Sequence, residues 1–177
     1  MLLVLRFVGV MNAAVWLGAT FFFTFGAGPA FFSPEMRNLL KENYPYFSGG
    51  VAQIVVARYF YWQLACALIA VAHLLGEWIY LGKTPPKLTA SLLGGILCLG
   101  LLGGFWLQPK LKSLHRIKYS PAATAGQRLQ AAASFRGWHG ASQGMNLIVL
   151  IGLAVYCWRT TNPPDSLRFV GAAKFKG

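Results

Sequence analysis

Polar residues inside long apolar stretches are the side chains best suited to chemistry in this chain. One stretch holds five such residues at roughly helical spacing, which would form a stripe: Arg58, Trp62, Cys66, His73 and Glu77. His73 and Glu77 stand four residues apart, so on a helix the carboxylate can hold the imidazole. A second stripe in the last apolar stretch comprises His139, Gln143 and Asn146, and Arg136 directly precedes this stretch.

Ionisable groups are costly inside a bilayer and are therefore functional candidates. Together the stripes could form a proton relay, a metal site or a set of cofactor ligands, with His73 and His139 as the cofactor-binding residues. The alternative, which we favour, is interhelical hydrogen bonding that fixes the helices relative to one another.

The depths of His73 and His139 in the membrane determine whether the two could ligate the same haem. His73 lies beyond the middle of its stretch and His139 at the start of another, so they differ in depth by about 18 Å at a helical rise of about 1.5 Å per residue. Two axial ligands of one haem need nearly the same level, which disfavours a bis-histidine haem. Haem or chlorophyll held by a single histidine stays open.

No familiar catalytic motif accompanies these residues. The sequence has no HExxH, GxSxG or glycine-rich phosphate loop. Its four acidic residues offer few ligands for a hydrolytic metal. We therefore predict a protein that is not an enzyme and has no metal site.

Four stretches without Asp, Glu, Lys or Arg indicate the elements that carry the stripes. Each is near or above the roughly 18–20 residues that a helix needs to cross a bilayer: 7–32, 59–76, 88–109 and 137–158. Only a helix satisfies its backbone internally at that length, and tryptophans at the ends of three stretches are typical of the membrane interface. We predict an all-α integral membrane protein, an antiparallel four-helix bundle, with one domain over 1–162 and helices near 3–32, 51–81, 88–108 and 121–159.

Local signals refine the connections. Ser33, Pro34 and Glu35 are typical of a helix start, and Ser120 with Pro121 predicts the start of the fourth helix. The basic segment 110–118 has an apolar face and is expected to lie along the membrane surface. In the third helix Gly100 and Gly104 form a GxxxG pair, a helix-packing face that serves either the bundle itself or another subunit.

Charge and the C-terminal tail bear on partners. Sixteen Lys and Arg stand against four Asp and Glu, and because they mostly flank apolar runs we expect membrane lipids as partners and no nucleic acid. The basic tail, 163–177, has too few apolar anchors to offset ordering costs of about 1–2 kcal/mol per residue, so a partner surface is expected. We predict an accessory subunit of a larger respiratory or photosynthetic membrane complex. The alternative is a carrier or sensor for a small molecule or metal that uses polar residues of the second and fourth helices.

Two segments also resemble a known family. The first runs through Trp16-Leu17-Gly18, Phe21-Phe22-Phe23 and Gly28-Pro29-Ala30-Phe31-Phe32, and the second through Phe135-Arg136-Gly137-Trp138-His139-Gly140-Ala141-Ser142 to Asn146-Leu147. They are similar to the family of small four-helix membrane proteins of unknown function that includes human transmembrane protein 205 and many bacterial proteins. The resemblance covers most of residues 5–158. It implies a four-helix membrane fold without established catalytic activity, and we expect a multi-pass protein of a bacterial inner membrane.

Overall fold

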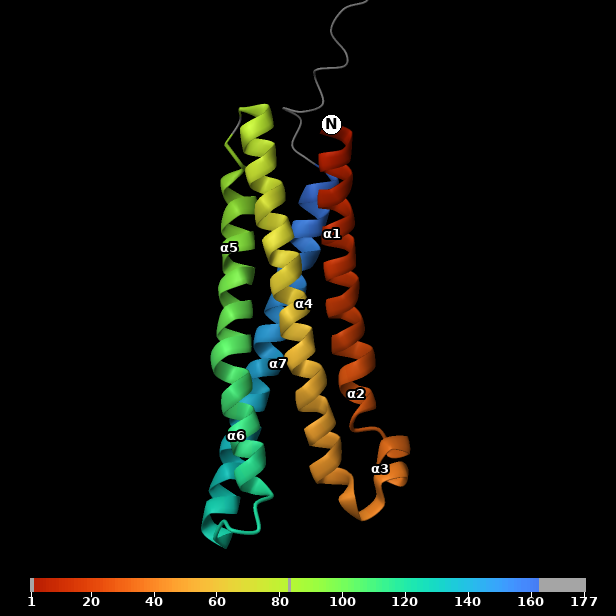
Figure 1. Cartoon of the computed structure of the whole chain (residues 1–177), viewed down its shortest axis with the longest axis vertical. Helices are drawn as coiled ribbons and strands as arrows, with labels where there is room; N and C mark the ends of the chain where they lie inside the picture. Colours follow the sequence, from red (N-terminus) through yellow and green to blue (C-terminus); the bar gives the residue numbers. More distant parts are fainter. Residues whose placement is uncertain (1, 83, 163–177) are drawn as a thin grey trace, which may run out of the picture.

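The computed structural model describes residues 2–82 and 84–162, which form helices joined by short connections. The predicted basic tail of residues 163–177 lies outside the described residues. Figure 1 shows the long helices side by side. The start of α1 (Leu2–Phe22) and the connection from α4 (Tyr44–Leu81) to α5 (Lys87–Leu101) lie at one end. At the other end lie α3 (Pro34–Leu40) and the connection from α6 (Gln108–Lys118) to α7 (Ala125–Thr161).

The first long helix contains a widened segment. α1 (Leu2–Phe22) continues through a π-helical segment (Phe23–Ala27) into α2 (Gly28–Ala30). Pro29 lies within α2 and has no backbone N–H to donate to the preceding turn. The wider π-helical turn directly before it keeps the chain helical up to Ala30.

The connection to the second long helix is itself helical. In α3 (Pro34–Leu40) the Oγ of Ser33 accepts a hydrogen bond from the backbone N–H of Met36 at 3.2 Å. The predicted helix start at Ser33 is therefore confirmed. A 3-10 turn (Lys41–Asn43) then leads into α4 (Tyr44–Leu81).

The second long helix starts earlier than the sequence predicted and ends where expected. It begins at Tyr44 rather than near residue 51. Pro45 does not prevent this earlier start, because it falls in the first turn, where a proline is tolerated. Gly82 ends α4 in a left-handed conformation with φ of 62°, which glycine adopts without strain. Its N–H donates to the carbonyl of Trp78 at 2.9 Å.

The third long helix is longer than predicted. α5 (Lys87–Leu101) runs through a π-helical segment (Leu102–Leu107) into α6 (Gln108–Lys118). The expected surface helix over 110–118 is therefore not a separate element. Its apolar face packs on α4 and α7 instead of on lipid, which buries Leu111 and His115.

The last long helix, α7 (Ala125–Thr161), starts at a different cap from the one predicted. Thr124 and Gln127 form a capping box: the Thr124 hydroxyl accepts from the Gln127 N–H at 3.3 Å, and the Gln127 side chain accepts from the Thr124 N–H at 2.9 Å. Two donors of the first turn are thereby satisfied. The prediction that Ser120 and Pro121 start this helix is wrong.

The long helices pack in a ring in which α1 and α5 each contact both α4 and α7. Small residues on α1 and α4 allow close approach, and larger side chains fill the centre; the buried core comprises Ala13, Trp16, Cys66, Ala67, Ala70, Leu93, Ile96, Val149, Leu153 and Tyr156.

Many large apolar side chains face outward instead of inward. Phe105 is 70% exposed, and Ile79 and Ile151 are 75% and 65% exposed. Within the described residues, four helical stretches are long and apolar enough to cross a membrane: Leu3–Ala30, Pro34–Tyr80, Lys87–Lys118 and Ala125–Thr161. The outward-facing surfaces of the helices are therefore apolar, as in a membrane protein.

Candidate functional site

A hydrogen-bonded polar network joins α1 to α4 in the middle of the apolar core. The indole N–H of Trp16 donates to Oε1 of Gln63, which lies 47 residues further along the chain. Nε2 of Gln63 donates to the hydroxyl of Thr20 at 3.1 Å and to the hydroxyl of Tyr59. Gln63 is only 6% exposed, so this one amide satisfies three neighbours inside the core.

Asn146 extends the network to α7. Its Oδ1 accepts a hydrogen bond from the Tyr59 hydroxyl at 3.0 Å, and its Nδ2 donates to the Thr24 hydroxyl at 2.7 Å. The hydroxyls of Thr24 and Thr20 in turn donate to the backbone carbonyls four residues before them. Donors and acceptors therefore match throughout, and the network links three long helices in one arrangement.

A cavity of about 440 Å³ lies beside this network, toward the end of the molecule that carries α3. Its walls come from the end of the first long helix, from α4, from α5 and α6, and from α7. Two flat aromatic pairs stand in these walls. Phe23 stacks on Tyr59 with centroids 4.0 Å apart, and Phe135 stacks on His139 at 5.7 Å, each within about 10° of parallel.

Polar side chains outside the network also line the cavity. They are Gln53, His139, Ser142 and Gln143. Oε1 of Gln53 is buried and has no hydrogen-bond partner among the described residues. A buried acceptor without a partner costs free energy, so a molecule with a donor group would gain by entering here.

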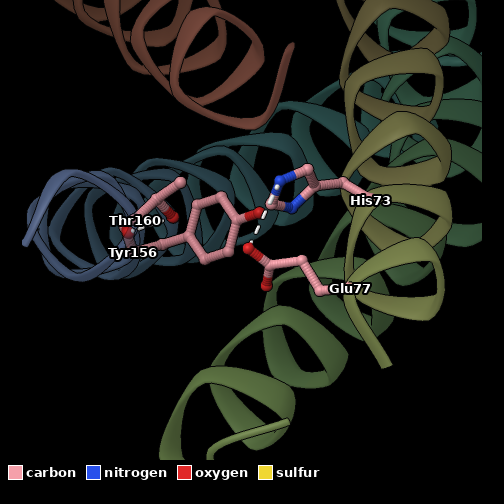
Figure 2. A network of polar contacts seen from close by, with 4 residues as sticks. All are labelled: His73, Glu77, Tyr156 and Thr160. Atoms are coloured by element: carbon pink, nitrogen blue, oxygen red, sulfur yellow. Dashed lines mark hydrogen bonds and ion pairs between the residues drawn. The ribbon is translucent and has the colours of Figure 1, made fainter. Parts of the chain in front are cut away.

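A second polar cluster lies nearer the other end of the molecule (Figure 2). Nε2 of His73 is 3.7 Å from Oε1 of Glu77 on the same helix, and Tyr156 reaches toward both from α7. His73 and Tyr156 are 5% and 1% exposed, yet neither the imidazole nitrogens nor the phenol has a hydrogen-bond partner in the described part of the chain. The Thr160 hydroxyl donates to the backbone carbonyl of Tyr156 and leaves the phenol free.

The two predicted stripes are brought together only in part. His139, Gln143 and Asn146 line the cavity, whereas His73 and Glu77 do not. The five residues of the α4 stripe also do not share one environment. Cys66 and His73 are buried, but Arg58 and Trp62 are exposed, and Arg58 lines a cleft beside α6. Arg136, directly before the last apolar run, is exposed.

The predicted glycine pair behaves asymmetrically. A Cβ at Gly104 would meet Phe60 of α4 at 3.3 Å, while a Cβ at Gly100 would have no neighbour within 4 Å. The closest approach is instead at Gly103, where a Cβ would lie 2.5 Å from Phe60 and 2.9 Å from Met145. The contact with α4 therefore depends on Gly103, which the GxxxG pattern does not include.

Sequence reasoning missed most of the network. Its members in the first long helix, Trp16, Thr20 and Thr24, recur every fourth residue, and this spacing is a signal of one polar helix face. Gln63 is an amide inside an uncharged run, and such residues commonly bond across helices. Among the described residues there is no group of three or more His, Cys, Asp or Glu side chains that could hold a metal ion.

Comparison with known proteins places the chain in a family. No curated protein and no solved structure matches it, and the resemblance to human transmembrane protein 205 is not borne out by any match. A family model described as a domain of unknown function, DUF4149, matches residues 11–120, which is more than half of the 177-residue chain. This match runs from α1 to the connection after α6 and leaves out α7. The chain therefore belongs to the DUF4149 family, whose function is unknown.

Proposed function

We propose that the protein is an integral membrane protein, an antiparallel four-helix bundle, that binds a lipid-soluble small molecule in the cavity between its helices. The proposal extends the alternative in which polar residues of the second and fourth long helices hold a ligand. It includes no catalytic step.

The outward-facing apolar side chains support the membrane placement. Soluble monomers rarely expose contiguous apolar patches larger than a few hundred Å², and here the exposed large hydrophobic residues occur along all four long helices. α4 has 38 residues, or about 57 Å of helix, against a hydrocarbon layer of about 30 Å. Its ends would therefore project into the headgroup region. If the protein is bacterial, helical spans place it in the inner membrane, because bacterial outer-membrane proteins are β-barrels.

The composition of the cavity walls supports the class of ligand. Binding sites for small molecules are typically about 300–1,000 Å³, mostly apolar, with a few convergent polar groups, and this cavity has about 440 Å³ and both features. The stacked pairs Phe23–Tyr59 and Phe135–His139 offer flat surfaces for a planar ring. Gln53, His139 and Ser142 offer hydrogen bonds to groups on the ring's edge.

The single observation that carries the proposal is the contrast between the network and the cavity. Gln63, Tyr59 and Asn146 already satisfy one another, which accounts for them as structural links. Gln53 keeps a buried acceptor unpaired at the cavity wall, which packing alone does not explain. The ligand expected is therefore an apolar ring compound with both donor and acceptor groups.

A matched pair of ring compounds tests this proposal. Protein purified in a mild detergent is titrated with 2,3-dimethyl-1,4-naphthohydroquinone under reducing conditions and with 2,3-dimethylnaphthalene, which lacks the oxygens. The hydroquinone should raise Tm more than the hydrocarbon does. Ser142→Phe, which fills the cavity, and Gln53→Leu should reduce that difference, whereas Gln130→Leu on the exposed part of α7 should not. Equal responses of all three variants would contradict the proposal.

A role as an accessory subunit of a respiratory or photosynthetic complex is a separate proposal. It depends on the basic tail, 163–177, which lies outside the described residues. Co-purification of stoichiometric partners from native membranes in mild detergent would support it, and a monomer under the same conditions would contradict it.

A further inference from the structure

A basic cleft of about 460 Å³ lies between α4 and α6, next to the cavity of the proposed function, with which it shares the wall residue Gln53. Three cationic side chains line it: Arg58 from α4, and Lys112 and Arg116 from α6. No carboxylate lines the cleft, and within the described residues none of the three cations forms an ion pair. The cleft is therefore a concentration of positive charge without a counter-charge from the protein.

The two walls of the cleft are fixed relative to each other. His115 is 8% exposed, and its Nε2 lies 3.2 Å from the backbone carbonyl of Tyr46 on α4. Its ring packs so closely on Gly49 that a Cβ there would come within 2.4 Å of Cε1. Because α6 is held to α4 in this way, the three cations are presented by a preformed surface. Tyr46 and Tyr61 line the same cleft, and a tyrosine hydroxyl is a group that can donate to an anion.

The position of the cleft along the helices matches the headgroup level of a bilayer. Arg58 directly precedes the uncharged run 59–76, and Lys112 follows closely after the uncharged run 88–109. Those runs are the parts of α4 and of α5 with its continuation that are suited to the hydrocarbon layer. The cations therefore lie at its edge, where lipid phosphates lie.

An apolar groove continues from the cleft toward the middle of the bundle. The groove has a volume of about 260 Å³ and shares Ala57, Tyr61 and Gln108 with the cleft. Beyond these residues its lining is mostly apolar and comprises Phe60, Leu64, Ala67, Leu97, Leu101 and Phe105, among others. From Ala57 to Ala67 it follows α4 for about 15 Å. A charged head region that leads into an apolar channel has the shape and polarity of a phospholipid.

We propose that the cleft and the groove together bind one anionic phospholipid. The phosphate accepts hydrogen bonds from Arg58, Lys112 and Arg116, which are the donors best suited to phosphate. One acyl chain lies in the groove between α4 and α5. A soluble anion would use only the cleft, and a neutral lipid would use only the groove, so the combination distinguishes a phospholipid from both.

The test uses the full-length protein, delipidated in a maltoside detergent, and three probes. Dioleoyl phosphatidylglycerol carries phosphate and chains, inorganic phosphate carries only the anion, and dioleoylglycerol carries only the chains. Native mass spectrometry counts bound lipid, and Tm against probe concentration gives affinity. Phosphatidylglycerol should saturate at one molecule per chain and raise Tm, while the other two probes should have little effect.

Charge-matched variants distinguish binding in the cleft from nonspecific attraction between the basic protein and an anionic lipid. Substituting the cleft cations in R58Q/K112Q/R116Q should weaken phosphatidylglycerol binding by at least about tenfold, since charge-assisted hydrogen bonds to phosphate are lost. Substituting three exposed cations outside the cleft, in R37Q/K41Q/R136Q, removes the same charge and should change the affinity by no more than about twofold. Equal losses in the two triple variants would overturn the proposal.

A second pair of variants tests the groove. Ala57→Phe blocks the junction of cleft and groove, and Leu101→Trp narrows the groove from the α5 side. Either change, in protein whose lipid-free Tm is unaltered, should weaken phosphatidylglycerol binding by about tenfold. If inorganic phosphate binds as tightly as phosphatidylglycerol, or if neither groove variant has an effect, the site is one for a soluble anion and the proposal is wrong.

Discussion

The imidazole of His73 lies against the backbone of Gly9, so closely that a Cβ at Gly9 would come within 2.2 Å of Nε2. This contact joins α1 to α4 across 64 residues of sequence and lets a large polar ring fit between two helices. It also explains why His73 is 5% exposed although neither of its nitrogens has a hydrogen-bond partner in the described residues. Glu77 and Tyr156 stand beside the same ring (Figure 2).

Gly9→Ala should therefore destabilise the bundle. The added methyl group forces the imidazole or the helix to move, and overpacking of this kind costs about 1–3 kcal/mol. Gly18→Ala is the matched control on the same helix, because a Cβ there meets nothing within 4 Å. Tm in detergent should fall for Gly9→Ala and stay unchanged or rise slightly for Gly18→Ala. If His73→Ala fails to restore the stability of Gly9→Ala, the contact is not the cause.

Gln63→Leu should also destabilise the protein, through the polar network. The change keeps the approximate size of the side chain but removes the acceptor for Trp16 and the donor to Thr20 and Tyr59. Leaving a buried donor unpaired costs about 1–3 kcal/mol. Unfolding in a denaturing detergent measures the loss, and Gln130→Leu, on an exposed part of α7, should leave stability unchanged. Equal stability of the two variants would show that the network is not important for the fold.

Substitutions at two nearby glycines of the third long helix should differ in their effect on stability. Gly103→Ala places a methyl group 2.5 Å from Phe60, on the contact with α4, whereas Gly100→Ala meets nothing within 4 Å. Gly103→Ala should lower stability by about 1–3 kcal/mol, and Gly100→Ala should have little effect. A larger loss at Gly100 in native membranes than in detergent would instead indicate that another subunit packs on this glycine.

The start of α7 gives a prediction about capping. Thr124→Ala removes the acceptor for the Gln127 N–H and should cost about 0.5–2 kcal/mol. Ser120→Ala changes a similar residue four positions earlier, where the chain is not yet in α7. Thermal unfolding followed by circular dichroism should show a lower Tm for Thr124→Ala only. Equal effects of the two substitutions would mean that the helix start moves between the two sites.

Some of these features were readable in the sequence and some were overlooked there. The cap at Ser33 was predicted because serine, proline and an acid occur in order. The cap at Thr124 carries an equally local signal, a glutamine three residues later, whereas Ser120 has Ala123 at that position. Ser120 followed by Pro121 favoured the wrong site, although Thr124 and Gln127 already formed a capping-box pattern in the sequence.

What the sequence determined by itself is the number and type of the long elements. Uncharged runs of this length must form helices in lipid, and each run is a local property of consecutive residues. The continuation of α5 into α6 was not determined in this way, because residues 108–118 are basic and amphipathic and suit either a surface helix or an extension. Burial of Leu111 and His115 against α4 and α7 decided for the extension.

Only the tertiary structure decided which polar residues meet. The sequence placed His73, Glu77, His139 and Asn146 on two stripes, but two stripes share a site only if their helices have the right rotation and axial register. Those quantities depend on contacts between residues far apart in the chain, such as His73 with Gly9 and Phe60 with Gly103. Side-chain size at these crossings therefore directs His139 and Asn146 to the cavity and leaves His73 and Glu77 in a separate cluster, which no periodicity within one helix can specify.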